Sequence, residues 1–121
     1  MAARIRHLSD DPVFEKIYPL DAEFDTLADA PEELRTGKRY ADKGDFSIEG
    51  CTKRIVEDFG PQPLDIVVHS LANGSEVKKP LIETSRKGYL QAVGVSAYSM
   101  VSMVQRLAPI MRKGGSFVSL T

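Results

Sequence analysis

The most informative stretch of this sequence is residues 64–74, which read LDIVVHSLANG. Residues 64–69 are nearly continuously apolar, and such a run predicts a strand covered on both faces, as in parallel sheets. Residues 70–74 are mostly small and end in a glycine, which lets the backbone approach a ligand closely. Because ligands of open α/β sheets bind beyond the carboxyl ends of strands, residues 70–74 are a candidate binding loop. From the residues alone, a plain connecting loop is an equally good interpretation.

The segments on either side of this run alternate between strand and helix signals. Ser47 can cap a helix that runs to about Phe59, and Gly60 can end it. The remaining expected elements are strands at residues 14–18 and 116–121 and a mostly helical stretch at 80–113, broken near Gly88 and ended by Gly114-Gly115. This order predicts βαβ units in an α/β fold, a Rossmann-type doubly wound parallel sheet of which the chain holds the central portion.

Residues 25–45 mix acidic, basic, proline and glycine residues with few apolar positions. The composition predicts a long surface excursion with one helical turn at Pro31–Leu34, where proline can open a helix. Loops of this length in compact domains are often functional.

Composition excludes several classes of function. Sixteen basic and seventeen acidic residues leave a net charge of -1, which gives no electrostatic basis for binding nucleic acid or an anionic membrane. The uncharged run 88–105 is too polar for a membrane helix, and residues 1–13 lack the apolar core of a signal peptide. The single cysteine, Cys51, is expected to be a small buried apolar residue. His7, His69 and Cys51 do not have metal-ligand spacing, so no metal is expected.

Two polar residues near strand ends have more than one interpretation. Asp21 could hydrogen-bond a ligand amine, although ending a strand is the simpler role. His69 could act as a general base, but its place at the end of an apolar strand favours a structural histidine whose hydrogen bonds are satisfied. The residues alone therefore predict part of a nucleotide-binding Rossmann-type domain.

The run at residues 64–74 resembles a segment of the plant and apicomplexan plastid enoyl-acyl-carrier-protein reductases. These enzymes are divergent members of the short-chain dehydrogenase/reductase superfamily. The similarity spans residue 13 or so to the end of the chain, and its other matching segments are 18–22, 38–40, 76–77, 79–81, 83–90, 96–99, 109–111 and 114–116. So long a match is far more specific than a lone glycine motif.

The resemblance implies an NADH-dependent enzyme that reduces the trans-2 double bond of an enoyl thioester on acyl carrier protein, in a plastid or apicoplast. It implies that Asp21 and Ala22 contact the adenine. Further cofactor contacts are implied for Ser70, Leu71 and Ala72, which line the wall beside the adenosine ribose. Ala72 and Gly74 resemble positions near the substrate and inhibitor pocket. Tyr98 and Ser99 resemble positions that shape the cofactor side of the sheet.

The sequence also departs from the pattern of that family. A glycine-rich turn that holds the pyrophosphate is absent, and the catalytic tyrosine and lysine are expected beyond Thr121. Residues 1–121 are therefore expected to be a partial NAD-binding domain without catalytic residues, inactive as an isolated chain. Two alternatives stay open: another short-chain dehydrogenase such as a ketoacyl reductase, which usually carries an NAG-type motif at residues 70–74, and a truncated, non-catalytic interaction module.

The stretch at residues 89–107 predicts assembly. Its apolar residues cover nearly all sides of a helix, and a helix that is apolar all round must be buried all round. One sheet can cover one side only, so a second subunit is expected to cover the other. The resemblance likewise implies a homotetramer built through this helix, and a neighbouring element of the same chain is the alternative.

Overall fold

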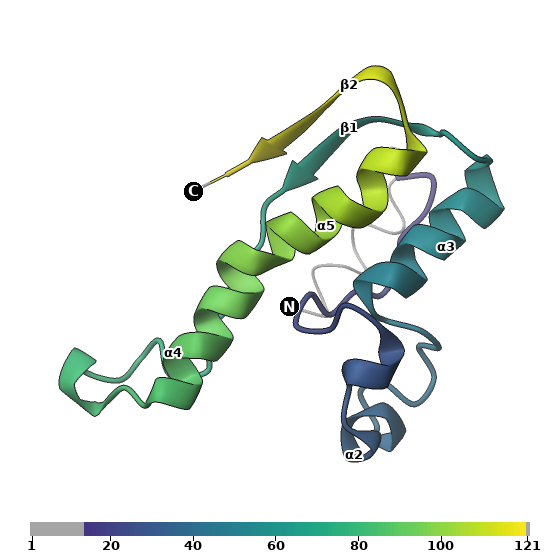
Figure 1. Cartoon of the computed structure of the whole chain (residues 1–121). Coiled ribbons are helices and arrows are strands. Elements are labelled where there is room, and N and C mark those ends of the chain that lie inside the picture. Colours follow the sequence, from purple (N-terminus) through teal and green to yellow (C-terminus); the bar gives the residue numbers. More distant parts are fainter. Residues whose placement is uncertain (1–13, 121) are drawn as a thin grey trace.

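The computed structural model describes residues 14–120 and shows a helical layer packed on a two-stranded sheet (Figure 1). The expectation that residues 1–13 hold no signal peptide lies outside this range. In chain order the elements are η1 (Leu27–Asp29), α2 (Glu32–Thr36), α3 (Ile48–Phe59), β1 (Leu64–His69), η2 (Leu81–Glu83), α4 (Arg86–Val93), η3 (Gly94–Tyr98), α5 (Ser99–Leu107), η4 (Ala108–Ile110) and β2 (Met111–Ser119).

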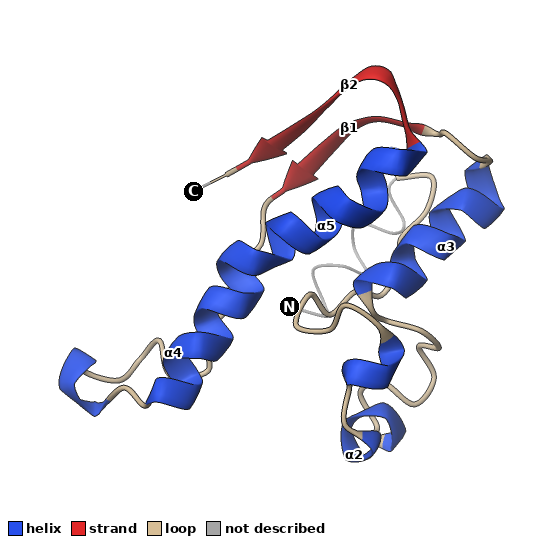
Figure 2. Ribbon diagram, in the orientation of Figure 1, coloured by secondary structure: helices blue, strands red, loops and turns tan. Residues whose placement is uncertain are grey.

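The two strands are parallel, as the apolar runs predicted. Val67 pairs with Phe117, and His69 pairs with Ser119. The chain crosses from β1 to β2 through the long helical stretch formed by α4, η3 and α5, so both strands end at the same edge of the sheet (Figures 1 and 2). The α/β class and the parallel pairing predicted from the sequence are confirmed.

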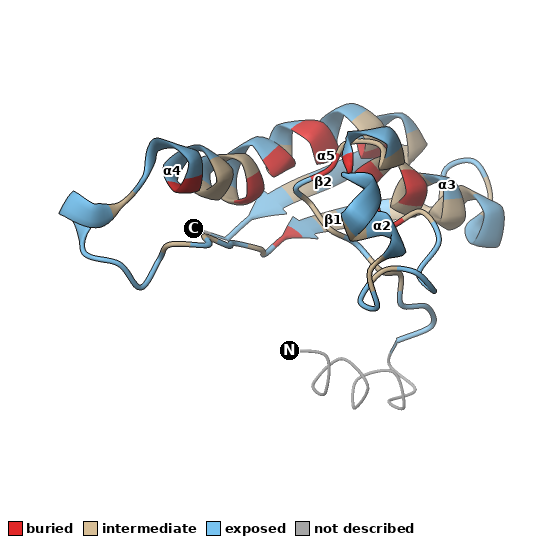
Figure 3. Cartoon of the chain, turned by 90° about the horizontal axis from the view of Figure 1, so that it is seen from below, coloured by how far each residue is buried: buried red, intermediate tan, exposed pale blue. Residues whose placement is uncertain are grey.

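Helices α3 and α5 cover one face of this sheet. Ile48 from α3 and Met103 and Leu107 from α5 are buried, and strand residues Leu64, Val67 and Phe117 pack against them. The opposite face is open: Ile66 and Val68 are 63% and 56% exposed (Figure 3). The prediction that residues 64–69 are covered on both faces is therefore wrong for the described chain, because both helices lie on the same side.

Helix α3 forms where its capping residues predicted. The Ser47 hydroxyl accepts a hydrogen bond from the Gly50 amide at 3.1 Å, and Gly60 ends the helix with a φ of 94°. Its expected apolar face is buried only at Ile48, and Phe59 at the far end is exposed. Cys51 is half-buried, and this burial raises the pKa of its thiol.

The second helical stretch differs from the prediction in three ways. Its break is not at Gly88, which lies inside α4 and is buried; α4 instead begins after Ser85, whose hydroxyl accepts from the Gly88 amide at 3.0 Å. A π-helical turn, η3, separates α4 from α5. The helical stretch ends at Ile110, and β2 begins at Met111. Gly114, which was expected to end the helix, lies inside this strand with a φ of 86°.

The expected strand at residues 14–18 is also wrong. These residues form neither helix nor strand, since a strand needs a paired neighbour and β1 and β2 pair only with each other within residues 14–120. Tyr18 is held instead by a hydrogen bond from its hydroxyl to Asp58 at 2.5 Å.

The excursion at residues 25–45 is more ordered than its composition indicated. The helical turn expected at Pro31–Leu34 is present as α2. The excursion folds around a small hydrophobic core of its own, with Phe24, Ala30 and Phe46 buried and Leu27, Leu34 and Tyr40 packed against them.

Within residues 14–120, no helix is long and apolar enough to span a membrane.

Candidate cofactor and substrate site

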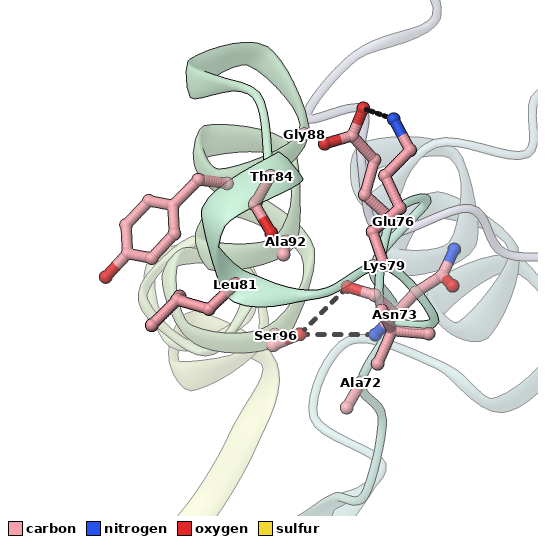
Figure 4. Close-up of a pocket in the computed structure, with 12 residues that line it drawn as sticks. Ala72, Asn73, Glu76, Lys79, Leu81, Thr84, Gly88, Ala92 and Ser96 are labelled. Atoms are coloured by element: carbon pink, nitrogen blue, oxygen red, sulfur yellow. Dashed lines mark hydrogen bonds and ion pairs between the residues drawn. The ribbon is translucent and has the colours of Figure 1, made fainter.

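A pocket of about 540 Å³ opens between the loop that follows β1 and the helical stretch α4–η3 (Figure 4). It lies beyond the carboxyl end of β1, where open α/β sheets bind ligands. Its walls are mainly small and apolar, from Ala72, Asn73, Gly74, Glu76, Val77, Lys79, Leu81, Thr84, Gly88, Tyr89, Ala92 and Ser96. Small residues at the loop and a few polar groups suit a ligand with both an apolar and a polar part.

Hydrogen bonds to the helix fix the loop wall of this pocket. The Ser96 hydroxyl accepts from the backbone amide of Asn73 and donates to its carbonyl, both at 3.2 Å (Figure 4). The Gln91 side-chain oxygen accepts from the Ser75 amide at 3.1 Å. Backbone groups of the loop therefore have fixed positions before any ligand arrives.

Glu76 joins the far end of the same loop to α4. Its carboxylate accepts from the Ser85 amide at 2.7 Å and pairs with the Lys79 ammonium at 2.8 Å. The hydrogen bond from Lys79, followed by that from Ser85, lowers the pKa of Glu76. A Cβ on Gly88 would lie 2.5 Å from this carboxylate, so only glycine leaves room for the contact.

The predicted substrate residues Ala72 and Gly74 both line the pocket. Gly74 approaches α4 closely: a Cβ built on it would lie 3.3 Å from the Cβ of Ala92. Ala22 and Leu71, predicted to contact the cofactor, pack against the same hydrophobic cluster beneath the sheet. Ser70 is exposed at the end of β1.

Asp21, the predicted adenine contact, lies in a turn and ends no strand. One carboxylate oxygen accepts from the Glu23 amide at 3.1 Å, and the other accepts from the Tyr40 hydroxyl at 2.5 Å. The side chain is only half-buried. Its carboxylate has further lone pairs with which to accept a ligand amine.

His69 is a structural histidine, as its position at the end of an apolar strand predicted. Its Nε2 lies 2.8 Å from the Ser99 hydroxyl, which itself donates to the Val95 carbonyl at 2.6 Å. Because that proton is used, Nε2 must donate to Ser99, and Nδ1 then accepts from Ser119 at 3.3 Å. Both ring nitrogens are engaged in structure, which argues against a general base here.

The predicted residues Tyr98 and Ser99 have different surroundings. Ser99 is buried beside His69, whereas Tyr98 is half-exposed and donates from its hydroxyl to Asp25 at 3.4 Å. Neither lines the pocket.

Within residues 14–120 no cluster of three His, Cys, Asp or Glu side chains could hold a metal ion.

Several residues of the site carried no sequence signal of their own. Gln91 and Ser96 lie five positions apart, a spacing that faces one side only because the π-helical turn begins at Gly94. Tyr40 reaches Asp21 only through the folding of the excursion. Neither arrangement could be predicted from the sequence.

Comparison with known proteins assigns the chain to a family. The sequence model described as Enoyl-(Acyl carrier protein) reductase matches residues 41–121. The chloroplastic NADH enoyl-acyl-carrier-protein reductase of Arabidopsis thaliana is 49% identical over 118 residues, which cover 96% of this chain and 30% of that protein. A chloroplastic relative from Oryza sativa is 48% identical and is covered to 31%. The chain thus spans about 30% of the length of these curated relatives.

Solved structures agree in fold. The Plasmodium berghei enoyl-acyl-carrier-protein reductase, solved with triclosan, superposes with a TM-score of 0.84 at 37% identity, over 99% of this chain and 43% of that one. The Aquifex aeolicus reductase gives a TM-score of 0.69 at 27% identity, again over 99% of this chain and 43% of that one. These matches confirm the Rossmann-type fold. The chain belongs to the enoyl-(acyl carrier protein) reductase family.

Proposed function

We propose that this chain is part of the NAD-binding Rossmann domain of an NADH-dependent enoyl-acyl-carrier-protein reductase of type II fatty-acid synthesis. The observation that carries the proposal is the pocket beyond β1, lined by Ala72 and Gly74 in a chain 49% identical to a named NADH reductase. The whole enzyme reduces the trans-2 double bond of an enoyl thioester carried by acyl carrier protein.

The described residues fit an NADH molecule that lies across the carboxyl ends of the strands. Asp21 would offer its half-buried carboxylate to the adenine amine, next to Ala22, which packs on the hydrophobic cluster of Ile48, Met103 and Leu107. Ser70, Leu71 and Ala72 would line the wall beside the adenosine ribose. NADH supplies the hydride when it is bound.

The apolar pocket wall fits the acyl part of the substrate. Ala72 and Gly74 line the pocket without bulky side chains, and Ser96 and Gln91 hold the backbone of their neighbours Asn73 and Ser75 in place. A preformed wall loses little conformational entropy when a thioester binds. These residues would bind and orient the substrate.

Assembly and location belong to the same proposal. Leu90, Val93 and Val101, the apolar stripe of α4–α5, are exposed and lie outside the pocket. A second subunit that covers this stripe is consistent with the homotetramer expected from the resemblance. The chloroplastic names of the plant relatives support a plastid location.

The test is the activity of the protein that contains this chain together with its flanking coding sequence. We expect that sequence to encode a glycine-rich βα turn before the chain and a tyrosine and lysine after it. The purified protein should oxidise NADH only when an enoyl thioester of acyl carrier protein is present. In-frame stops on both sides, or a complete protein without this activity, would leave the non-catalytic module as the better explanation.

A further inference from the structure

The excursion at residues 25–45 leaves and rejoins the domain at one place. The Asp21 amide donates to the Phe46 carbonyl at 2.8 Å, and the Ile48 amide donates to the Phe24 carbonyl at 3.1 Å. These bonds close the excursion next to Asp21. Side chains of the excursion therefore have a fixed position relative to Asp21, the predicted adenine contact.

The side chain that reaches from the excursion back to this point is Tyr40. Its ring packs on Phe46 with a centroid distance of 4.3 Å, and Phe46 is 1% exposed and in edge contact with Phe24. The Arg39 guanidinium covers the ring at 5.2 Å. With the ring held in this way, the hydroxyl is directed at Asp21, 2.5 Å from its Oδ2.

The bond between Tyr40 and Asp21 is of the short, charge-assisted kind, in which a neutral hydroxyl donates to a carboxylate. Burial and this hydrogen bond raise the pKa of Tyr40 to about 12, so the hydroxyl keeps its proton at neutral pH. The Glu23 amide holds the other carboxylate oxygen. Both oxygens of Asp21 are thus anchored, and its side chain is limited to one orientation.

We propose that Tyr40 is a positioning residue, which orients the Asp21 carboxylate for the adenine end of the cofactor, and that the excursion exists to place it. This inference rests on the proposed function. A carboxylate that is already oriented loses less rotational freedom when a ligand binds. Tyr40 should therefore affect cofactor affinity and leave the chemical step unchanged.

The chain offers a matched control. Tyr18 donates to Asp58 at the same 2.5 Å, and burial followed by this bond likewise raises the pKa of Tyr18 to about 12. Asp58 lies near the end of α3 and has no assigned role in the site. Tyr18→Phe and Tyr40→Phe each remove one hydroxyl and keep the ring, so any effect common to both variants is structural.

The experiment compares both variants with wild type in the complete reductase. We expect Tyr40→Phe to raise the Kd for NADH, measured by fluorescence titration, about two- to tenfold, with kcat and the KM for the enoyl thioester unchanged. Tyr18→Phe should leave all three at wild-type values. In an Asp21→Ala background, Tyr40→Phe should have no further effect, because the residue acts through Asp21.

Three results would overturn the inference. One is a Kd for NADH in Tyr40→Phe equal to that of wild type. Another is an equal rise in Tyr18→Phe, and the third is an undiminished effect of Tyr40→Phe in the Asp21→Ala background. A wild-type protein that does not use NADH would instead overturn the proposed function, so the two failures are distinguishable.

Discussion

The Nε2 of His69 lies 2.8 Å from the Oγ of Ser99, which joins the last residue of β1 to the first residue of α5. His69 also pairs with Ser119 across the sheet. Both strands therefore end at a point that is fixed to the helical layer. The loop wall of the pocket begins directly after this point, so the orientation of residues 70–74 depends on it.

The first prediction concerns this connection. Replacing Ser99 with alanine leaves the Nε2–H of His69, a side chain only 2% exposed, without an acceptor. We expect the free energy of unfolding to fall by about 1–3 kcal/mol, the cost of an unsatisfied buried donor. Urea unfolding of the complete protein, followed by circular dichroism, measures it.

The control for this prediction is Ser119→Ala. The Ser119 hydroxyl lies 3.3 Å from His69 Nδ1, a longer and weaker bond. Its loss should cost about 1 kcal/mol or less. If Ser99→Ala proves as stable as wild type, the bond to His69 does not hold the strands to the helix.

The second prediction concerns the pocket wall. In the proposed reductase, Ala72→Val adds two methyl groups to a loop that is fixed by Ser96 and cannot easily retreat. We expect the KM for the enoyl thioester to rise about tenfold, a typical cost of overpacking. Steady-state kinetics test this, with Ala108→Val, an exposed position outside the pocket, as the control. An unchanged KM in Ala72→Val would remove Ala72 from the substrate site.

The third prediction is a pH dependence at Glu76. Its pKa in the folded protein is lowered from the ordinary value of 4.5, mainly by Lys79. The ionised group therefore contributes stability above about pH 4.5, and this contribution is lost as the pH falls through the lowered pKa. Wild type should have a higher Tm than Glu76→Gln at neutral pH, and the difference should vanish in acid.

Differential scanning calorimetry between neutral pH and about pH 3 measures this difference across the range in which the carboxyl titrates. Glu83→Gln serves as the control, since Glu83 is exposed and lies in the same loop region. A difference between wild type and Glu76→Gln that stays constant with pH would show that the charge of Glu76 contributes nothing.

The sequence predicted those parts of the fold whose signals are local. Ser47 and Gly60 delimit α3 because a capping hydroxyl and a positive φ are properties of single positions. The strand at residues 64–69 follows from its own apolar residues. By contrast, the start of β2 at Met111 could not be predicted, because it rests on the pairing of Met111 with Leu64, and Gly114 follows where the register between the strands shifts.

In the candidate site, too, residues with a local signal could be predicted, and contacts between distant residues could not. Ala72 and Gly74 could be predicted because they follow a strand end and match a family segment. The contact between Tyr40 and Asp21 could not, because it joins residues 19 positions apart through a small core that composition does not reveal. Gln91 and Ser96 were missed because the π-helical turn changes which side of the helix each residue faces.

The last prediction concerns assembly. Leu90 and Val101 on the helical stretch α4–α5 are 60% and 49% exposed and lie outside the pocket. Burying such side chains favours association by about 25 cal/mol for each Å² of apolar surface, so we expect the complete protein to be a tetramer joined through this helix. A charge at its centre would have to be buried unpaired, and Val101→Glu should therefore dissociate the tetramer. Ala41→Glu adds the same charge on the exposed excursion and should leave it intact. Sedimentation velocity of the three proteins tests this: a wild-type monomer, or a Val101→Glu variant that assembles like Ala41→Glu, would show that another element covers the helix.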